Sequence, residues 1–168
     1  MTGEVDPRAT PRHETIVVGV DGSAASAAAV RWAAAEADRR RARLHAVHVV
    51  EPESRESSSP DADIRLQLEL ARQTVPGRVG DWVFRSGVEV DVAVSVVTGH
   101  TAGQLAREAA DASLVVIGTP ESLHHSDLPD DLAFGCLCPV VMVGAFGDVT
   151  HLGVPSHPHT KGASHARA

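Results

Sequence analysis

The side chains best suited to chemistry lie in the second half of the chain, where histidines and cysteines come close together in the sequence. They are His124, His125, Cys136 and Cys138. Such residues supply the nitrogen and sulfur ligands that zinc and copper prefer. Their spacing matches no standard zinc finger, however, and a free cysteine commonly serves as a small buried residue. We therefore predict no metal site here, and no structural disulfide between cysteines separated by one residue.

The turn Asp21-Gly22-Ser23 is a second candidate, because it follows a short apolar run. Its aspartate could contact a nucleobase or a ribose, or it could only stabilise the turn. Both interpretations stay open from the residues alone. The chain contains no G-x-S-x-G elbow, P-loop lysine or H-E-x-x-H motif. The prediction is therefore a protein that is not an enzyme.

Composition limits the classes of partner. The chain has 168 residues, of which 43% are hydrophobic, and a net charge of -7 from 15 Lys and Arg against 22 Asp and Glu. This balance argues against nucleic-acid binding, which needs a basic surface. No apolar run reaches the ~18 residues needed to span a membrane. The N-terminal segment also lacks a secretory signal pattern, so the expected location is cytoplasmic.

Five apolar segments read as strands, and most of them are separated by segments with helical spacing. The segments are Ile16–Val20, Leu44–Val50, Val88–Val96, Leu114–Ile117 and Pro139–Val143. Continuous apolar runs are typical of strands buried on both faces of a parallel sheet. The pattern predicts an α/β fold with an open, Rossmann-like, five-stranded parallel sheet and helices on both faces. Ligands of such sheets bind beyond the carboxyl ends of the strands, where the strand order reverses.

The connecting segments carry their own signals. Ser23 can cap a helix that runs to about Arg41, and Thr101–Gln104 forms a capping box for a later helix. Pro76-Gly77 is expected to interrupt the helix that contains Ile64. Residues 1–14 and 146–168 lack periodicity and are predicted to be disordered tails on one domain, residues 15–145.

Several motifs, in this order and spacing, resemble the universal stress protein family over residues 14 to 145. They are Val18-Gly19-Val20-Asp21-Gly22-Ser23, Leu44–Val50, Thr98–Leu105, Ala112–Gly118 and Cys138–Val143. The order and spacing are more specific than any single motif. The resemblance implies an adenine nucleotide alpha hydrolase-like variant of the Rossmann-like fold.

Many members of this family bind ATP, and the resemblance implies where a nucleotide would lie. Asp21 would sit by the adenine, Val49 would line that pocket with its backbone, and Gly99 would lie near the ribose. Gly118 would begin the phosphate-binding loop G-x2-G-x9-G-[ST]. Glycines allow the backbone N–H groups of such a loop to close around the phosphates.

This chain departs from the family at that loop. Glu121 occupies the position of the second glycine, and Asp131 followed by Leu132 occupies that of the third. With Asp127 and Asp130, four carboxylates fall where three phosphates would lie, and no Lys or Arg stands between Gly118 and Cys138. Like charges at these distances oppose phosphate binding. We therefore expect ATP binding to be weak or absent and predict no cofactor, with ATP or AMP as the alternatives.

The resemblance also implies a partner. Universal stress proteins commonly dimerise by pairing the last strand, here Pro139–Val143, with the same strand of a second copy. An unpaired apolar edge strand would favour aggregation. The alternative is that Gly144–Phe146 and the following tail fold over this edge.

Three functions remain open from the sequence. The first is a dimeric regulatory or adaptor protein of the stress response with little or no ATP affinity. The second keeps a pocket for adenosine, AMP or another small ligand. The third is a member that binds ATP or hydrolyses it weakly through an altered loop.

Overall fold

The computed structural model describes residues 13–52, 60–119 and 127–152. Strands and helices alternate through most of this range. The elements are β1 (Thr15–Gly19), α1 (Ala24–Arg40), β2 (Arg43–Val50), α2 (Pro60–Phe84), β3 (Val92–Thr98), α3 (Thr101–Glu108), β4 (Leu114–Gly118), α4 (Leu128–Gly135), β5 (Val140–Val143) and β6 (Val149–Leu152).

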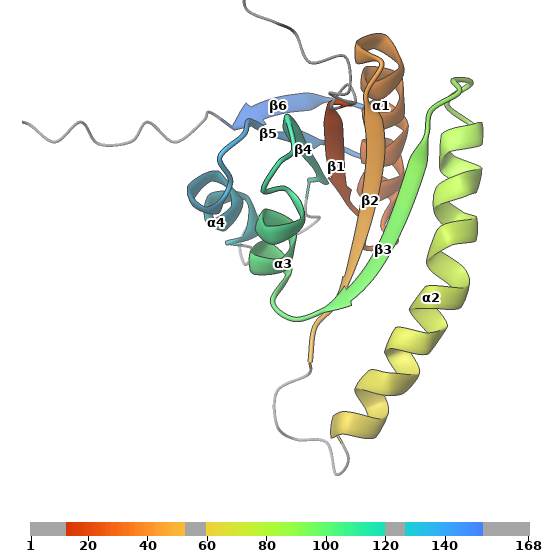
Figure 1. Ribbon diagram of the computed structural model, residues 1–168, viewed down its shortest axis with the longest axis vertical. Coiled ribbons are helices and arrows are strands. Elements are labelled where there is room, and N and C mark those ends of the chain that lie inside the picture. The colour runs from red at the N-terminus through yellow and green to blue at the C-terminus, as the bar shows by residue number, and fades with distance from the viewer. Residues whose placement is uncertain (1–12, 53–59, 120–126, 153–168) are drawn as a thin grey trace, which may run out of the picture.

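The helices cover both faces of one sheet, as predicted (Figure 1). The strand order is β3-β2-β1-β4-β5-β6, and the first five strands are parallel to their neighbours. One buried cluster packs α1 and α2 against the sheet, and a second packs α3 and α4 against the opposite face. Residues such as Val17 and Val18 are fully buried on alternate faces, which explains the continuous apolar run in β1.

The sheet has six strands, so the prediction of five was wrong by one. β6 runs antiparallel to β5, with Val143 opposite Val149 and Val140 opposite Leu152. The loop between them closes through a hydrogen bond from Gly144 N to Asp148 O at 2.8 Å. This strand falls within the segment 146–168 that was predicted to be a disordered tail. The remainder of that prediction, and residues 1–12, lie outside the described residues.

β6 also bears on the predicted homodimer. Strand β5 is hydrogen-bonded to β4 on one side and to β6 on the other. A second copy could therefore pair with β5 only if β6 left its place. β6 covers this edge of β5 and is itself the edge strand of the sheet. It lies in the segment after Gly144, as in the alternative stated from the sequence.

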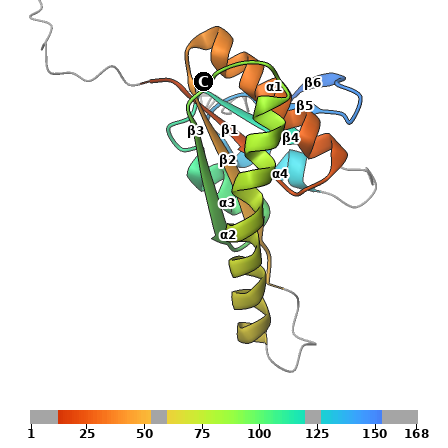
Figure 2. The same cartoon turned by 90° about the vertical axis from the view of Figure 1, so that its right-hand side faces the viewer.

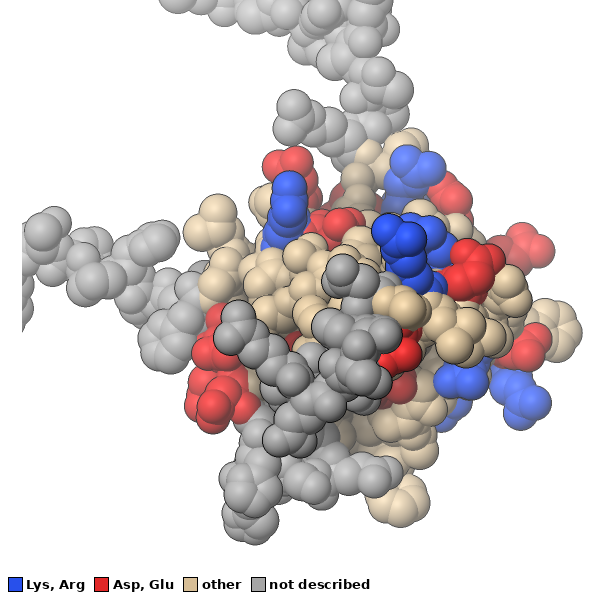
Figure 3. Space-filling view, turned by 90° about the horizontal axis from the view of Figure 1, so that it is seen from below, with Lys and Arg blue, Asp and Glu red and all other residues tan. Residues whose placement is uncertain are grey.

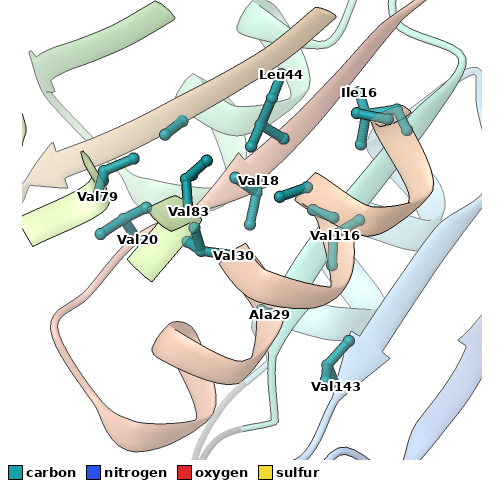
Figure 4. Close-up of a cluster of buried hydrophobic side chains, with 14 of the residues drawn as sticks. Ile16, Val18, Val20, Ala29, Val30, Leu44, Val79, Val83, Val116 and Val143 are labelled. Atoms are coloured by element: carbon teal, nitrogen blue, oxygen red, sulfur yellow. The ribbon is translucent and has the colours of Figure 1, made fainter. Parts of the chain in front are cut away.

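Helix α2 is continuous through Pro76, where an interruption had been expected. A proline inside a helix costs about 3 kcal/mol or more, so another interaction must hold the helix together. Val75, Val79 and Val83 recur every fourth residue, and all three are buried against the sheet. Figure 4 shows Val79 and Val83 beside side chains of the sheet and of α1. Packing of this stripe outweighs the local preference.

The first half of α2 extends beyond the sheet. Figures 1 and 2 show this half projecting past the lower ends of β2 and β3. Leu66 and Leu70 on this half are 61% and 51% exposed, so they lie largely outside the core. Among the helices of the described residues, none is both long enough and apolar enough to cross a membrane.

Candidate functional site

A pocket opens at the carboxyl ends of the central strands, at the point where the strand order reverses between β1 and β4. Its cavity volume is about 70 Å³. Ligand pockets usually measure ~300–1,000 Å³, so the described residues leave room for only part of a nucleotide. The lining residues are Gly19, Val20, Asp21, Val47, Val49, Thr101, Leu105, Ile117, Gly118 and Leu128.

Asp21 lies at the end of β1 and is fixed by its own turn. Its Oδ1 accepts a hydrogen bond from Ser23 N at 2.9 Å, and its backbone N donates to Ser26 Oγ at 3.2 Å. Ser23 caps α1 as predicted, because its Oγ accepts from Ser26 N at 3.0 Å. Asp21 is exposed and lines the pocket, so both of its interpretations fit this geometry.

The side chain of His48 contacts the backbone just before the same turn. Nδ1 of His48, on β2, lies 2.6 Å from the backbone oxygen of Val20, while Val20 N donates to Val47 O at 2.8 Å. A ring N–H is the donor that this carbonyl requires, so Nδ1 carries the proton. The pocket wall between β1 and β2 is thereby fixed from two sides. Nothing in the local sequence indicated this role for His48, because its partner lies 28 residues away.

Gly118 ends β4 directly against the first turn of α1. A Cβ at this position would lie 2.6 Å from Ser26 N and 2.7 Å from the carbonyl carbon of Ala25. Both are backbone atoms, which cannot move away as a flexible side chain could. Gly118 therefore has a packing reason to be glycine that is independent of any phosphate.

The start of α3 forms the side of the pocket beside β2. Gly99 does not itself line the cavity; it has φ +140 and lies two residues before Thr101, which does. The predicted capping box is wrong, because Thr101 is the first helical residue and His100, the N-cap, makes no side-chain cap. The backbone N–H of Thr101 instead donates a hydrogen bond to the side chain of Glu51, and Thr101 N lies 2.6 Å from Glu51 Oε1.

Glu51 is the site residue that the sequence did not reveal. It immediately follows β2, and its bond to Thr101 joins positions 50 residues apart. Hydrogen bonds from the Thr101 hydroxyl and backbone N–H hold the pKa of Glu51 below its ordinary value. The carboxylate is therefore ionised at neutral pH, and it occupies the helix end where an anion is favoured.

Further acidic residues lie beside Leu128, on the opposite side of the pocket. Asp127, Asp130 and Asp131 are all exposed at the start of α4. Figure 3 looks onto this end of the sheet and shows acidic side chains gathered at the left, the side on which Figure 1 places α4. Glu121, the fourth predicted carboxylate, lies outside the described residues.

A basic group comes near the site from the other face of the sheet. Arg78 belongs to α2, and its Nη1 lies 2.6 Å from where a Cβ of Gly22 would be. Within the part of the chain that the structure describes, neither Arg78 nor any other Lys or Arg lines the cavity. The lining is thus mostly apolar, with a carboxylate from Asp21 and a hydroxyl from Thr101.

The cysteines are buried and unsuited to reaction. Cys136 and Cys138 are both free thiols within the core beneath α3 and α4. Burial raises the pKa of the Cys136 thiol to about 11, and it also raises that of Cys138. His124 and His125, the histidines considered with them from the sequence, lie outside the described residues. Over residues 13–52, 60–119 and 127–152, no three His, Cys, Asp or Glu side chains are grouped to hold a metal ion.

A Ser-His-Glu cluster on β2, β3 and α3 resembles a catalytic triad only in composition. Nε2 of His45 lies 2.8 Å from Ser95 Oγ and 3.7 Å from Glu108 Oε2. A triad needs the nucleophile and the carboxylate on opposite ring nitrogens, whereas here both face the same nitrogen. The cluster does not form a proton relay.

These residues fit one part of ATP better than another. Apolar side chains of β2, β4 and α3 offer a surface for a heterocycle, and the acceptors of Asp21 and Glu51 suit amine or hydroxyl donors. Among the described residues, no Lys or Arg lines the cavity, and Asp127, Asp130 and Asp131 lie exposed at the start of α4. The described lining therefore supplies no cation for a phosphate chain.

The strand order and the pocket at its reversal define an open α/β protein with a pocket at its topological switch point. A family model for the universal stress protein family matches residues 13–144. The chain belongs to the universal stress protein family. The resemblance stated from the sequence is thus confirmed.

Individual relatives agree with this assignment. A universal stress protein of Mycobacterium tuberculosis (strain ATCC 25618 / H37Rv) is 34% identical over 109 residues, which is 65% of this chain and 36% of the relative. The chain thus spans about a third of the length of the curated relatives it matches. A solved member from Burkholderia pseudomallei is 28% identical, with a TM-score of 0.62 over 78% of this chain and 96% of that one.

A more distant solved structure shares the fold. It is a universal stress protein in complex with cAMP, 24% identical, with a TM-score of 0.57 over 78% of this chain and 97% of that one.

Proposed function

We propose that this universal stress protein is a cytoplasmic regulatory or adaptor protein with weak or absent ATP binding, and that it is not an enzyme. The observation that carries the proposal is the set of exposed carboxylates at the start of α4, from Asp127, Asp130 and Asp131. The family resemblance places the phosphate-binding loop between Gly118 and this helix, where like charges oppose a phosphate. Asp21 adds a further carboxylate to the pocket lining.

Two features of the described residues support a role without catalysis. The thiols of Cys136 and Cys138 stay protonated at neutral pH because burial raises the pKa of each. His45 cannot relay a proton between Ser95 and Glu108 through one nitrogen. Weak ATP hydrolysis would have to depend on groups beyond these.

A second candidate function is supported by the cavity itself. Asp21, Val49 and Gly118, three of the residues proposed from the family resemblance, line one pocket. Gly99 lies beside it, at the start of α3. A small ligand such as adenosine or AMP could then act as the signal that the protein transmits.

The proposed partner is a second copy of the chain. Pairing through β5 requires the release of β6, because both edges of β5 are hydrogen-bonded within the chain. The interface proposed from Pro139–Val143 is therefore available only after this exchange, which would make dimerisation dependent on the stability of the β5–β6 hairpin.

Thermal unfolding with millimolar ATP and Mg²⁺ tests the proposal. A ligand at ~100-fold above its dissociation constant stabilises a fold by ~2.7 kcal/mol. For a chain of this size each 1 kcal/mol shifts Tm by roughly 2–4 °C, so binding would be visible. We expect no shift with ATP. A clear rise in Tm would show that the phosphates are held despite the acidic rim, and the proposal would be wrong.

A further inference from the structure

Helix α2 carries large apolar side chains on the side that faces solvent. Leu66, Leu70 and Phe84 are 61%, 51% and 85% exposed. Figure 2 shows α2 at the front of the molecule, with its outer side towards the viewer. A surface helix of a globular protein normally presents charged and polar residues on that side. The exposed side chains of α2 thus depart from the usual amphipathic pattern.

The three side chains lie in one row along the helix. Positions three or four residues apart share a side of a helix. The row, called the outer row below, consists of Leu66, Leu70, Gln73, Gly77, Gly80 and Phe84, all of them exposed. The stripe of Val75, Val79 and Val83 that packs on the sheet lies on the other side of the helix. Helix α2 therefore has two apolar sides, and the chain covers only one of them.

The glycines of the outer row have no packing reason within the chain. A Cβ at Gly77 or at Gly80 would meet nothing within 4 Å, whereas a Cβ at Gly118 would meet the backbone of α1. Glycine is also less favourable than alanine inside a helix. Between the exposed leucines and Phe84, these glycines leave the helix backbone open to close approach from outside the chain.

The charge of α2 suits a second copy of the chain. The whole chain has a net charge of -7, which opposes association of two copies. Residues 60–85 differ, because they contain four acidic and four basic residues. Among the described residues, Arg65, Arg72 and Arg85 make no ion pair. Two copies can therefore meet along this helix without net repulsion.

We propose that the outer row of α2 is a self-association surface on which α2 of a second copy packs in antiparallel orientation. When the two helices cross between Gln73 and Gly77, Leu70 of one copy meets Gly80 of the other. Leu66 of one copy then meets Phe84 of the other. A large side chain facing a glycine fills the space between two closely packed helices. The pairing also gives the projecting half of each α2 a partner.

This surface is separate from the β5 interface proposed above. Helix α2 packs against β2 and β3, whereas β5 lies towards the other end of the strand order. Pairing through the outer row requires no release of β6. It also leaves the proposed regulatory function independent, since that function does not depend on where two copies meet.

Sedimentation velocity of the full chain at rising concentration, up to about 0.5 mM, tests the proposal, since one pair of helices is a small interface and binds weakly. We expect a reversible dimer. Leu70→Glu should weaken its formation by about tenfold or more, because each copy would bury an unpaired carboxylate. Gln67→Glu is the matched control, because it adds the same charge to the same part of α2 at an exposed position outside the outer row. It should leave the association unchanged.

Gly80→Leu gives a second, independent reading. Leucine has a higher helix propensity than glycine, so this variant should raise Tm at low protein concentration. Its side chain would hold the two helices apart, so the same variant should weaken association. A role of Gly80 within the single chain would not produce these opposite effects.

A wild-type protein that stays monomeric over the whole concentration range would overturn the inference. So would a dimer that Leu70→Glu and Gly80→Leu leave intact, and a response of that dimer to Thr150→Pro would assign it to β5 instead. The proposed function fails on a different measurement, the rise in Tm with ATP.

Discussion

Replacement of Gly118 by alanine separates a packing role from a ligand-binding role at this glycine. The added Cβ would lie 2.6 Å from Ser26 N and 2.7 Å from the carbonyl carbon of Ala25. Because these are backbone atoms of the first turn of α1, relief requires the strand and the helix to separate. Overpacking of this kind costs typically about 1–3 kcal/mol, and we expect the upper half of that range.

The expected loss of about 2–3 kcal/mol corresponds to a fall in Tm of about 4–12 °C for a chain of this size. Thermal unfolding without any ligand measures it directly. Gly103→Ala is the matched control, because a Cβ there meets nothing within 4 Å and Gly103 lies inside α3. Alanine in a helix interior is favoured over glycine by about 0.5–1 kcal/mol, so this variant should be slightly more stable.

A Gly118→Ala variant that unfolds at the wild-type temperature would refute the packing argument. It would mean that β4 does not end against α1 as closely as described. If that variant also lost a ligand that the wild-type protein binds, the glycine would be required by the ligand alone.

Three further predictions concern other parts of the chain. A hydrogen bond from Arg39 is the main cause that lowers the pKa of Glu36 from 4.5 to about 2. The stability that the ionised Glu36 carboxylate contributes is therefore complete above pH 4.5 and is lost as the pH falls towards 2. Urea unfolding should therefore show Glu36→Gln to be less stable than wild type at pH 7 and equal to it near pH 2; an equal deficit at both pH values would contradict the assignment. Burial should keep Cys136 and Cys138 unreactive towards a disulfide reagent at pH 7 until urea unfolds the chain, and rapid native labelling would show that the core beneath α4 opens. Thr150→Pro removes a backbone donor from β6, so sedimentation should show more dimer than for wild type if dimers form through β5, and an unchanged distribution would argue against that interface.

Much of the fold follows from short sequence patterns. Ile16–Val20 and Leu114–Ile117 are apolar throughout, and such runs are characteristic of strands covered on both faces. Ser23 was identified as a helix cap because its partner, Ser26, lies only three residues away. These features depend on neighbours in the sequence, and they were predicted correctly.

The features that were missed depend on distant residues. Pro76 lies in an unbroken helix because Val79 and Val83 are held by the sheet. β6 has only four residues, and its place beside β5 is visible only once the loop at Gly147 turns the chain back. The bond of Glu51 to Thr101 spans 50 positions, and no local motif announces it.

Helix α2 gives the molecule an uneven distribution of local stability. Its 25 residues extend about 37 Å at 1.5 Å per residue, and only its later turns carry the buried stripe that includes Val79 and Val83. In its earlier turns Leu66 and Leu70 are exposed, and Ile64 and Leu68 are only partly buried against the core. Amide hydrogens there should exchange with deuterium through local opening, while those of β1 and β4 exchange only when the whole domain unfolds. One continuous helix would then contain two regions that open on very different timescales, and the region that opens most readily leads from the end of β2.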